Sequence, residues 1–215
     1  MQIKKRQAID YIKNNASVYT FMVILFFTGI IFGAVIVNSM NFVQKHDLFF
    51  YLERFFGEIS NNQHIERVDI LKESFFYHLK YLLLMFILGF SVIGLPVVWL
   101  LLFLKGIVVG FSVGFIVNQL GMQGLVLSAL SIAPQNLVVI PVYIVAGSLS
   151  MIFSLALINK LFSRRFSPTP VFHSFGKYFT IFLGLVLLSF GAAAIEAYIA
   201  NGAMVSIIKS FYSKA

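Results

Sequence analysis

The 215-residue chain contains no cysteine and few charged residues. Without cysteine it can form no disulfide, no thiolate metal site, no cysteine nucleophile and no lipid attachment through cysteine. Charged residues make up 11% of the chain and hydrophobic residues 60%, whereas soluble domains carry about 25% charged residues. The excess of apolar residues lies in blocks longer than 18 residues, which read as membrane spans. The composition therefore predicts an integral membrane protein.

The positive charge of the chain indicates how it is oriented in a membrane and does not indicate a nucleic-acid-binding site. The formal net charge is +8, but the basic residues flank apolar blocks instead of lining a groove. Four basic residues lie before the first block, and four lie in the acid-free segment 159–177. Because basic residues favour the cytoplasmic side, we expect both segments in the cytoplasm and expect no nucleic-acid partner.

The apolar blocks predict an all-α polytopic helix bundle with about five spans, which form one integral membrane domain. The expected spans are residues 17–38, 81–104, 106–130, 134–158 and 178–200. This arrangement leaves residues 1–16 and the basic loop 159–177 in the cytoplasm. Residues 39–80 and the tail 201–215 then lie outside the cell membrane.

The segment 39–80 has the pattern of an amphipathic outer helix. Apolar residues recur near helical spacing, with charged residues between them: Phe42, Phe49, Leu52, Phe56 and Ile59. Two arrangements fit this pattern, a helix on the outer membrane surface or a small helical hairpin over the span ends. A second helix, over residues 65–80, is expected to run directly into the span 81–104.

Lys105 is the only charged residue between Lys80 and Lys160. We place it in a tight cytoplasmic turn between the second and third spans, where a lysine can reach the lipid headgroups.

The third span, 106–130, is interrupted by Gly121, Gln123 and Gly124. Either it is one long helix, or it breaks into a short helix and a half-helix. A break at membrane depth would have to line a cavity or be buried in protein.

The residues Gly110–Gly114 read GFSVG and match the G-x-S-x-G pattern of serine hydrolases. That pattern requires a strand-to-helix turn and a nearby histidine. Ser112 instead lies in an apolar segment of helical length, and no histidine lies within an expected span. We interpret the match as an accident of glycine spacing and expect no catalytic residue and no enzymatic activity.

The glycines instead predict close helix packing. In the third span, Gly106, Gly110 and Gly114 lie four residues apart. In the first span, Gly29 and Gly33 have the same spacing. Such glycine faces let two helix backbones approach closely. They are candidates for internal packing, and dimerisation through one of them is the open alternative.

Glu196 is the most unusual polar residue of the apolar blocks. A carboxylate inside a span is costly and usually faces protein or water, so Glu196 is either a buried polar site or a residue solvated at the interface. Gln135 and Asn136 are milder candidates for the same intramembrane polar site. No HExxH, phosphate-loop or dinucleotide motif occurs, so the sequence predicts no metal and no cofactor.

Several stretches in combination resemble the stage II sporulation protein M family of endospore-forming bacteria. They cover most of the chain in the family's order and read FTGIIFGAVIVNS, LFFYLERFFG, GLPVVWLLLFLKGIVVGFSVGF, APQNLVVIP and AAAIEAYI. The resemblance implies a multi-pass protein of the mother-cell membrane, located at the sporulation septum and acting in engulfment of the forespore. It also implies a scaffold that positions two peptidoglycan-degrading partners, a lytic transglycosylase and an amidase/endopeptidase.

A scaffold of this kind needs an outward contact surface, for which Phe49, Leu52 and Phe56 are the candidates. The competing hypothesis is a permease or channel-like subunit, which the interrupted third span and Glu196 would favour.

Overall fold

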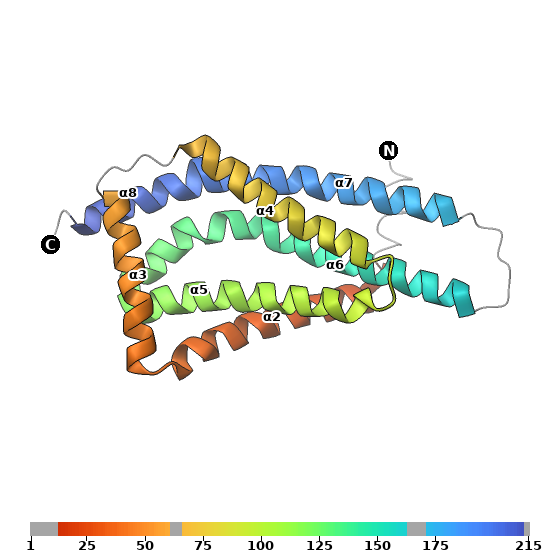
Figure 1. Ribbon diagram of the computed structural model, residues 1–215, viewed down its shortest axis with the longest axis horizontal. Helices are drawn as coiled ribbons and strands as arrows, with labels where there is room; N and C mark the ends of the chain where they lie inside the picture. Colours follow the sequence, from red (N-terminus) through yellow and green to blue (C-terminus); the bar gives the residue numbers. More distant parts are fainter. Residues whose placement is uncertain (1–12, 61–65, 163–170, 213–215) are drawn as a thin grey trace.

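Every regular element in this computed structural model, which describes residues 13–60, 66–162 and 171–212, is a helix. The elements are α2 (Ala16–Ser39), α3 (Phe42–Ser60), α4 (Arg67–Leu88), α5 (Gly94–Ser131), α6 (Ala133–Phe162), α7 (Val171–Ile195), the π-helical turn η1 (Glu196–Ala200) and α8 (Asn201–Tyr212). Helices α2, α4, α5, α6 and α7 run along the long axis of the molecule, and α3 lies across one end (Figure 1). The predicted all-α bundle is confirmed.

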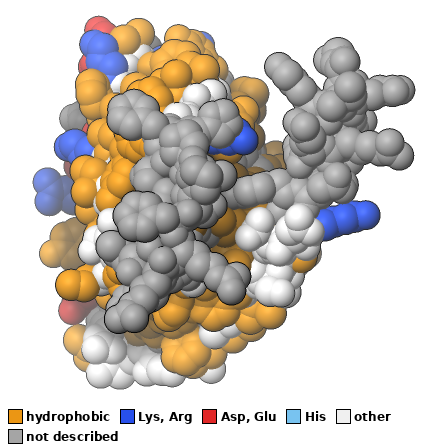
Figure 2. Space-filling view, turned by 90° about the vertical axis from the view of Figure 1, so that its right-hand side faces the viewer, with side chains coloured by type: hydrophobic (Ala, Val, Ile, Leu, Met, Phe, Trp, Pro, Cys, Tyr) orange, Lys and Arg blue, Asp and Glu red, His pale blue; other side chains and the backbone are white. Residues whose placement is uncertain are grey.

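Four helical stretches of the described chain are long and apolar enough to cross a membrane: Ala16–Ser39, Gly94–Ser131, Ala133–Asn159 and Phe175–Ser210. Helix α4 runs beside them but carries several charged residues, Asp69, Lys72, Glu73 and Lys80. Hydrophobic side chains also cover most of the described surface at the end where α6 and α7 are connected (Figure 2). These features fit a helical membrane bundle, with α4 as its most polar member.

The predicted turn at Lys105 is wrong, and so are the boundaries 81–104 and 106–130. Helix α4 ends at Leu88 and α5 begins at Gly94, so the chain reverses within residues 89–93. The backbone N–H of Gly94 closes this turn by donating to the Ser91 carbonyl, at 3.1 Å. Helix α6 holds the turn in place, because the Ser154 hydroxyl donates to the same carbonyl at 3.0 Å. The turn escaped prediction because apolar residues surround it on both sides.

Lys105 consequently lies inside α5, near the middle of the membrane-spanning region. Its neighbour Gly106 packs against Gly29, which lies near the centre of the charge-free helix α2.

Helices α2 and α5 pack backbone against backbone. A Cβ atom added at Gly29 would collide with the Phe103 carbonyl oxygen and would lie 3.1 Å from the Gly106 Cα. Gly33 and Gly110 are equally tight against the opposite backbone. Gly114 differs from these four, because a Cβ there would make an ordinary contact, 3.5 Å from the Ala34 Cα. The interface therefore depends on four glycines, and dispersion between the closely approaching backbones holds it together.

Helix α6 is bound to its neighbours through small polar side chains. The Ser150 hydroxyl donates to the Met85 carbonyl at 2.9 Å, and the Tyr178 hydroxyl donates to the Phe86 carbonyl at 3.0 Å. The Tyr178 ring stacks on Phe153 with a centroid distance of 4.4 Å. Such contacts fix the relative positions of α4, α6 and α7 where the hydrophobic effect between helices is weak.

The end of the bundle beneath α3 has its own small core, formed by Phe56 of α3, Leu127 of α5 and Ile208 of α8. Helix α3 begins with a reciprocal cap in which the backbone N–H groups and side chains of Asn41 and Gln44 bond each other at 3.1 Å. The expected tail 201–215 is helical as far as Tyr212. Of the expected cytoplasmic segments, residues 1–12 and 163–170 lie outside the described residues.

Candidate functional site

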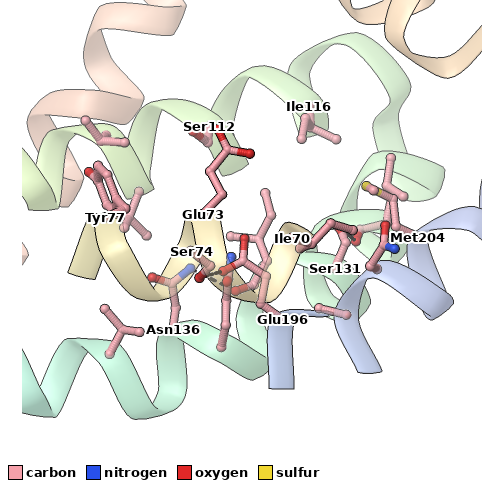
Figure 3. A pocket seen from close by; sticks show the side chains of 18 of the residues that line it. Ile70, Glu73, Ser74, Tyr77, Ser112, Ile116, Ser131, Asn136, Glu196 and Met204 are labelled. Atoms are coloured by element: carbon pink, nitrogen blue, oxygen red, sulfur yellow. Dashed lines mark hydrogen bonds between the residues drawn. The ribbon is translucent and has the colours of Figure 1, made fainter. Parts of the chain in front are cut away.

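A cavity of about 650 Å³ lies beneath α3, between α4, α5, α6 and η1. Its outer part is apolar and includes Phe55 and Phe56 of α3 and Met204 of α8. Its deeper part is polar, and Figure 3 shows side chains from α4, α5, α6 and η1 converging there. A hollow with charged and amide groups inside a membrane bundle is a candidate binding site.

Glu196 lies on one wall of this cavity, at the first residue of η1. It is half-buried and accepts a hydrogen bond from the Ser74 hydroxyl of α4. The Gln135 amide lies against the same carboxylate, and with its nitrogen turned toward Glu196 it donates to Oε1 at 3.1 Å. The π-helical turn widens the helix at this point, a distortion frequently found at functional sites. The structure thus places Glu196 and Gln135 in one hydrogen-bonded group.

Asn136 also lines the cavity, but its amide serves the backbone. The amide nitrogen donates to the Ile132 carbonyl at 2.8 Å, one turn earlier in the chain. This bond engages the Ile132 carbonyl at the start of α6, and the Asn136 amide oxygen remains available as an acceptor.

Lys105 lies deeper in the cavity, within a cage of tyrosines. Its ammonium donates to the Tyr77 hydroxyl at 3.1 Å and lies 4.4 Å from the centre of the same ring. The rings of Tyr81 and Tyr143 lie at 5.8 Å and 5.3 Å from the ammonium nitrogen. Aromatic faces attract a cation electrostatically, so the cage lowers the cost of placing a charge at this depth.

His78 of α4 forms the second buried polar group of the cavity. Its Nδ1 lies 2.6 Å from the Tyr143 hydroxyl, while its Nε2 has no hydrogen-bond partner among the described residues. The side chain is 5% exposed and lines the cavity. Unbonded polar atoms are rare in buried positions, and a group of this kind beside a cavity points to something that binds there.

Replacing Tyr143 with phenylalanine should lower the free energy of unfolding by about 1–2 kcal/mol, because both His78 nitrogens would then be buried without a partner. Chemical unfolding of the purified protein in detergent measures this loss. The control is Tyr51→Phe, which removes a hydroxyl from a side chain that is 68% exposed and should change little. Equal stabilities of the two variants would show that the bond to His78 contributes nothing.

The long helix α5 breaks at Gly121, which resolves the alternatives for this span. Gly121 has φ 56° and ψ −130°, outside the helical region. The piece after the break brings Leu127 and Ser131 to the cavity, and the piece before it contributes Ser112 and Ile116. A break in a membrane helix is tolerated where it is covered by protein or lines a cavity, and both pieces of α5 line this one.

Ser112 sits on the cavity wall in a continuous stretch of helix rather than on a strand-to-helix turn. The described residues include no hydrogen bond between Ser112 and a histidine, and the Nδ1 of His78 is directed to Tyr143. The arrangement therefore lacks the geometry that the G-x-S-x-G pattern requires.

The predicted outer surface needs one correction. Phe56 is only 7% exposed, because it packs into the small core beneath α3, and Leu52 packs against the same core. Phe49 is half-buried. The outward face of α3 is formed instead by other aromatic residues, which are exposed and do not line the cavity: Phe42, Phe50 and Tyr51.

Several cavity residues were missed by reasoning from the sequence alone, among them His78 and Lys105. His78 was assigned to a polar outer segment, and Lys105 to a cytoplasmic turn. The signal for Lys105 was present, since a single charge in a long apolar region is unusual. The sequence gives no signal for His78, because the hydrogen bond that holds it is made with Tyr143, which is 65 residues away in the chain.

Comparison with protein families adds an independent finding. The chain matches the model of the family described as Stage II sporulation protein M over residues 8–201. No curated protein and no solved structure matched the chain. Since the match covers most of the chain, the protein belongs to the stage II sporulation protein M family and is a sporulation-related membrane protein.

Proposed function

We propose that this protein is a membrane scaffold of the engulfment machinery, which acts in the mother-cell membrane at the sporulation septum. In this proposal it carries out no catalysis itself. It recruits peptidoglycan-degrading partners, a lytic transglycosylase and an amidase/endopeptidase. Family membership supports the setting in sporulation, and the outward face of α3 supports the recruitment.

The outward face of α3 is the observation that carries the proposal. Phe42, Tyr51 and Phe50 are 82%, 68% and 59% exposed. Arg54 and Glu58 form an exposed ion pair on the same helix, with 3.3 Å between Nε and Oε1. Aromatic residues with charged neighbours on an exposed surface are typical of protein interfaces.

The position of α3 suits contact with enzymes of the cell wall. It lies across the end of the bundle opposite the end of α6 and the start of α7, the two helices that flank the basic segment (Figure 1). If basic segments remain in the cytoplasm, α3 faces the wall and the C-terminal helix α8 lies on the same side.

Replacing Phe50 and Tyr51 together with alanine should abolish co-purification of both hydrolases from sporulating cells, because the two rings form the centre of the proposed contact. The matched control is Phe179→Ala on α7, which removes an exposed ring, 51% accessible, from a helix along the side of the bundle. Recovery of both hydrolases with the α3 variant at the wild-type level would refute the scaffold.

A permease or channel-like subunit is the second candidate, and the meeting of the broken helix α5 with Glu196 at one cavity favours it. In this case Glu196→Gln would block engulfment while recruitment of the hydrolases persisted. A scaffold predicts the opposite response, with recruitment sensitive to α3 and indifferent to Glu196.

A further inference from the structure

The cavity contains two opposite charges that do not neutralise each other. The ion pairs of the described residues join Arg54 to Glu58 and Lys72 to Asp69, and neither pair includes Glu196 or Lys105. Both of these residues nevertheless line the cavity. Charged groups within membrane bundles usually pair with one another or serve a pathway or ligand, so two such groups on one cavity indicate a missing occupant.

The two charges lie at different depths. Glu196 is bonded to Ser74, whereas Lys105 is bonded to Tyr77, which precedes His78. Ser74 and Tyr77 are three residues apart on α4, which corresponds to about 4.5 Å along the helix. An occupant that reaches both charges must therefore carry its own two charges on separate atoms.

The deeper position offers hydrogen-bond donors to an anionic group. An ammonium has three N–H groups, and among the described residues only the Tyr77 hydroxyl accepts one from Lys105. His78 lines the same cavity, with its Nδ1 hydrogen-bonded to the Tyr143 hydroxyl. Lys105 thus offers unused N–H donors at the deeper level of the cavity.

The shallower position offers acceptors to a cationic group. Glu196 keeps free lone pairs after accepting from Ser74 and Gln135. Glu73 also lines the cavity and extends from α4 toward Ser112, as Figure 3 shows. The lining therefore carries two carboxylates that would attract the cationic end of an occupant. The described residues hold no group of three or more His, Asp and Glu suited to a metal ion, which favours an organic ammonium.

From these observations we infer that the cavity binds a small zwitterion, with its ammonium at Glu196 and Glu73 and its phosphate or carboxylate at Lys105. A volume of about 650 Å³ accommodates such a molecule. The same chemistry occurs in a free zwitterion and in the headgroup of phosphatidylethanolamine. The inference deepens the second candidate function by naming a ligand class, but binding can occur without transport and does not depend on recruitment by α3.

Calorimetric titration of the full chain in nanodiscs made only of phosphatidylglycerol tests the inference. The probes are phosphoethanolamine and 4-aminobutyrate as zwitterions, ethanolamine as the cation alone and glycerol 3-phosphate as the anion alone. At least one zwitterion should bind, and the two single-charge probes should bind at least tenfold more weakly. A second arm, with phosphatidylethanolamine in the nanodisc, identifies the source, because an occupying lipid would suppress the heat from the free zwitterion and would be retained on purification.

Two variants separate binding from folding. Glu196→Gln keeps the shape of the side chain and one acceptor oxygen but removes the charge, and Lys105→Met removes the ammonium. Each should weaken zwitterion binding at least tenfold, whereas the exposed-charge controls Glu58→Gln and Lys72→Met should bind as the wild type does. Unfolding midpoints of all four variants verify that they are folded. The inference is overturned if no zwitterion binds and phosphatidylethanolamine is not retained, or if the cavity variants bind like the controls.

Discussion

Replacing Gly106 with leucine is expected to destroy the bundle and to lower the free energy of unfolding by more than about 3 kcal/mol. A Cβ at this position would collide with the Phe26 carbonyl oxygen and would lie 3.1 Å from the Gly29 Cα. Backbone atoms cannot swing aside as a flexible side chain can, so α2 and α5 would have to separate along their length. Unfolding of the purified protein by a denaturing detergent, followed by circular dichroism, measures the loss.

The matched control is Gly184→Leu on α7, where no atom lies within 4 Å of an added Cβ. The free energy of unfolding of this variant should remain within about 0.5 kcal/mol of the wild-type value. Gly114→Ala provides an intermediate point, since its Cβ would make an ordinary contact with Ala34. If Gly106→Leu and Gly184→Leu lost the same stability, the close contact between α2 and α5 would not exist.

The same contacts decide which glycine faces remain open to a second copy of the chain. Gly29, Gly33, Gly106 and Gly110 are occupied within the bundle and are not free for a dimer. On α7, by contrast, Gly184 and Gly191 have open space around them. A dimer that uses a glycine face would therefore form through α7.

Length and apolar content predicted the regular spans well. The first expected span, 17–38, differs from α2 by one residue at each end, and the expected span 134–158 lies within α6. These spans were predictable because polar residues mark both ends of long charge-free runs. A run of this kind can cross a membrane only in a structure that satisfies its backbone hydrogen bonds, such as a helix.

The turn at residues 89–93 was not predictable in the same way. Its stability comes from contacts made far along the chain, such as the bond from Ser154 to the Ser91 carbonyl. Within the local sequence, Gly89, Ser91 and Gly94 are weak signals beside the apolar residues around them. The charge of Lys105, twelve residues later, predicts a turn there instead. The tyrosines that surround it are not visible in the sequence, because only the fold brings their helices together.

The candidate site was predictable in the polar residues of the expected spans, which are Glu196, Gln135 and Asn136. Glu196 is conspicuous because a carboxylate in an apolar run needs a reason. Its partner Ser74 lies 122 residues away and has no feature that distinguishes it from other serines. Polar residues inside spans can therefore be found from the sequence, whereas the group that they form requires the packing of α4, α6 and η1.

Gly121→Ala should lower the free energy of unfolding by about 1–3 kcal/mol, because φ 56° with ψ −130° is strained for any residue with a Cβ. No atom lies within 4 Å of the added methyl group, so the loss would come from the backbone alone. The piece of α5 after the break carries Leu127 and Ser131 to the cavity. Any shift of this piece should also weaken ligand binding there, which the calorimetric titration would detect.

Gly57→Ala on α3 is the matched control, since its Cβ also has no atom within 4 Å but its backbone is helical. Alanine favours a helix over glycine, so this variant should gain about 0.5–1 kcal/mol. The two substitutions make the same chemical change and should shift stability in opposite directions. A gain in both variants would mean that α5 continues as a regular helix through Gly121, and the cavity would then lose the half-helix that closes it.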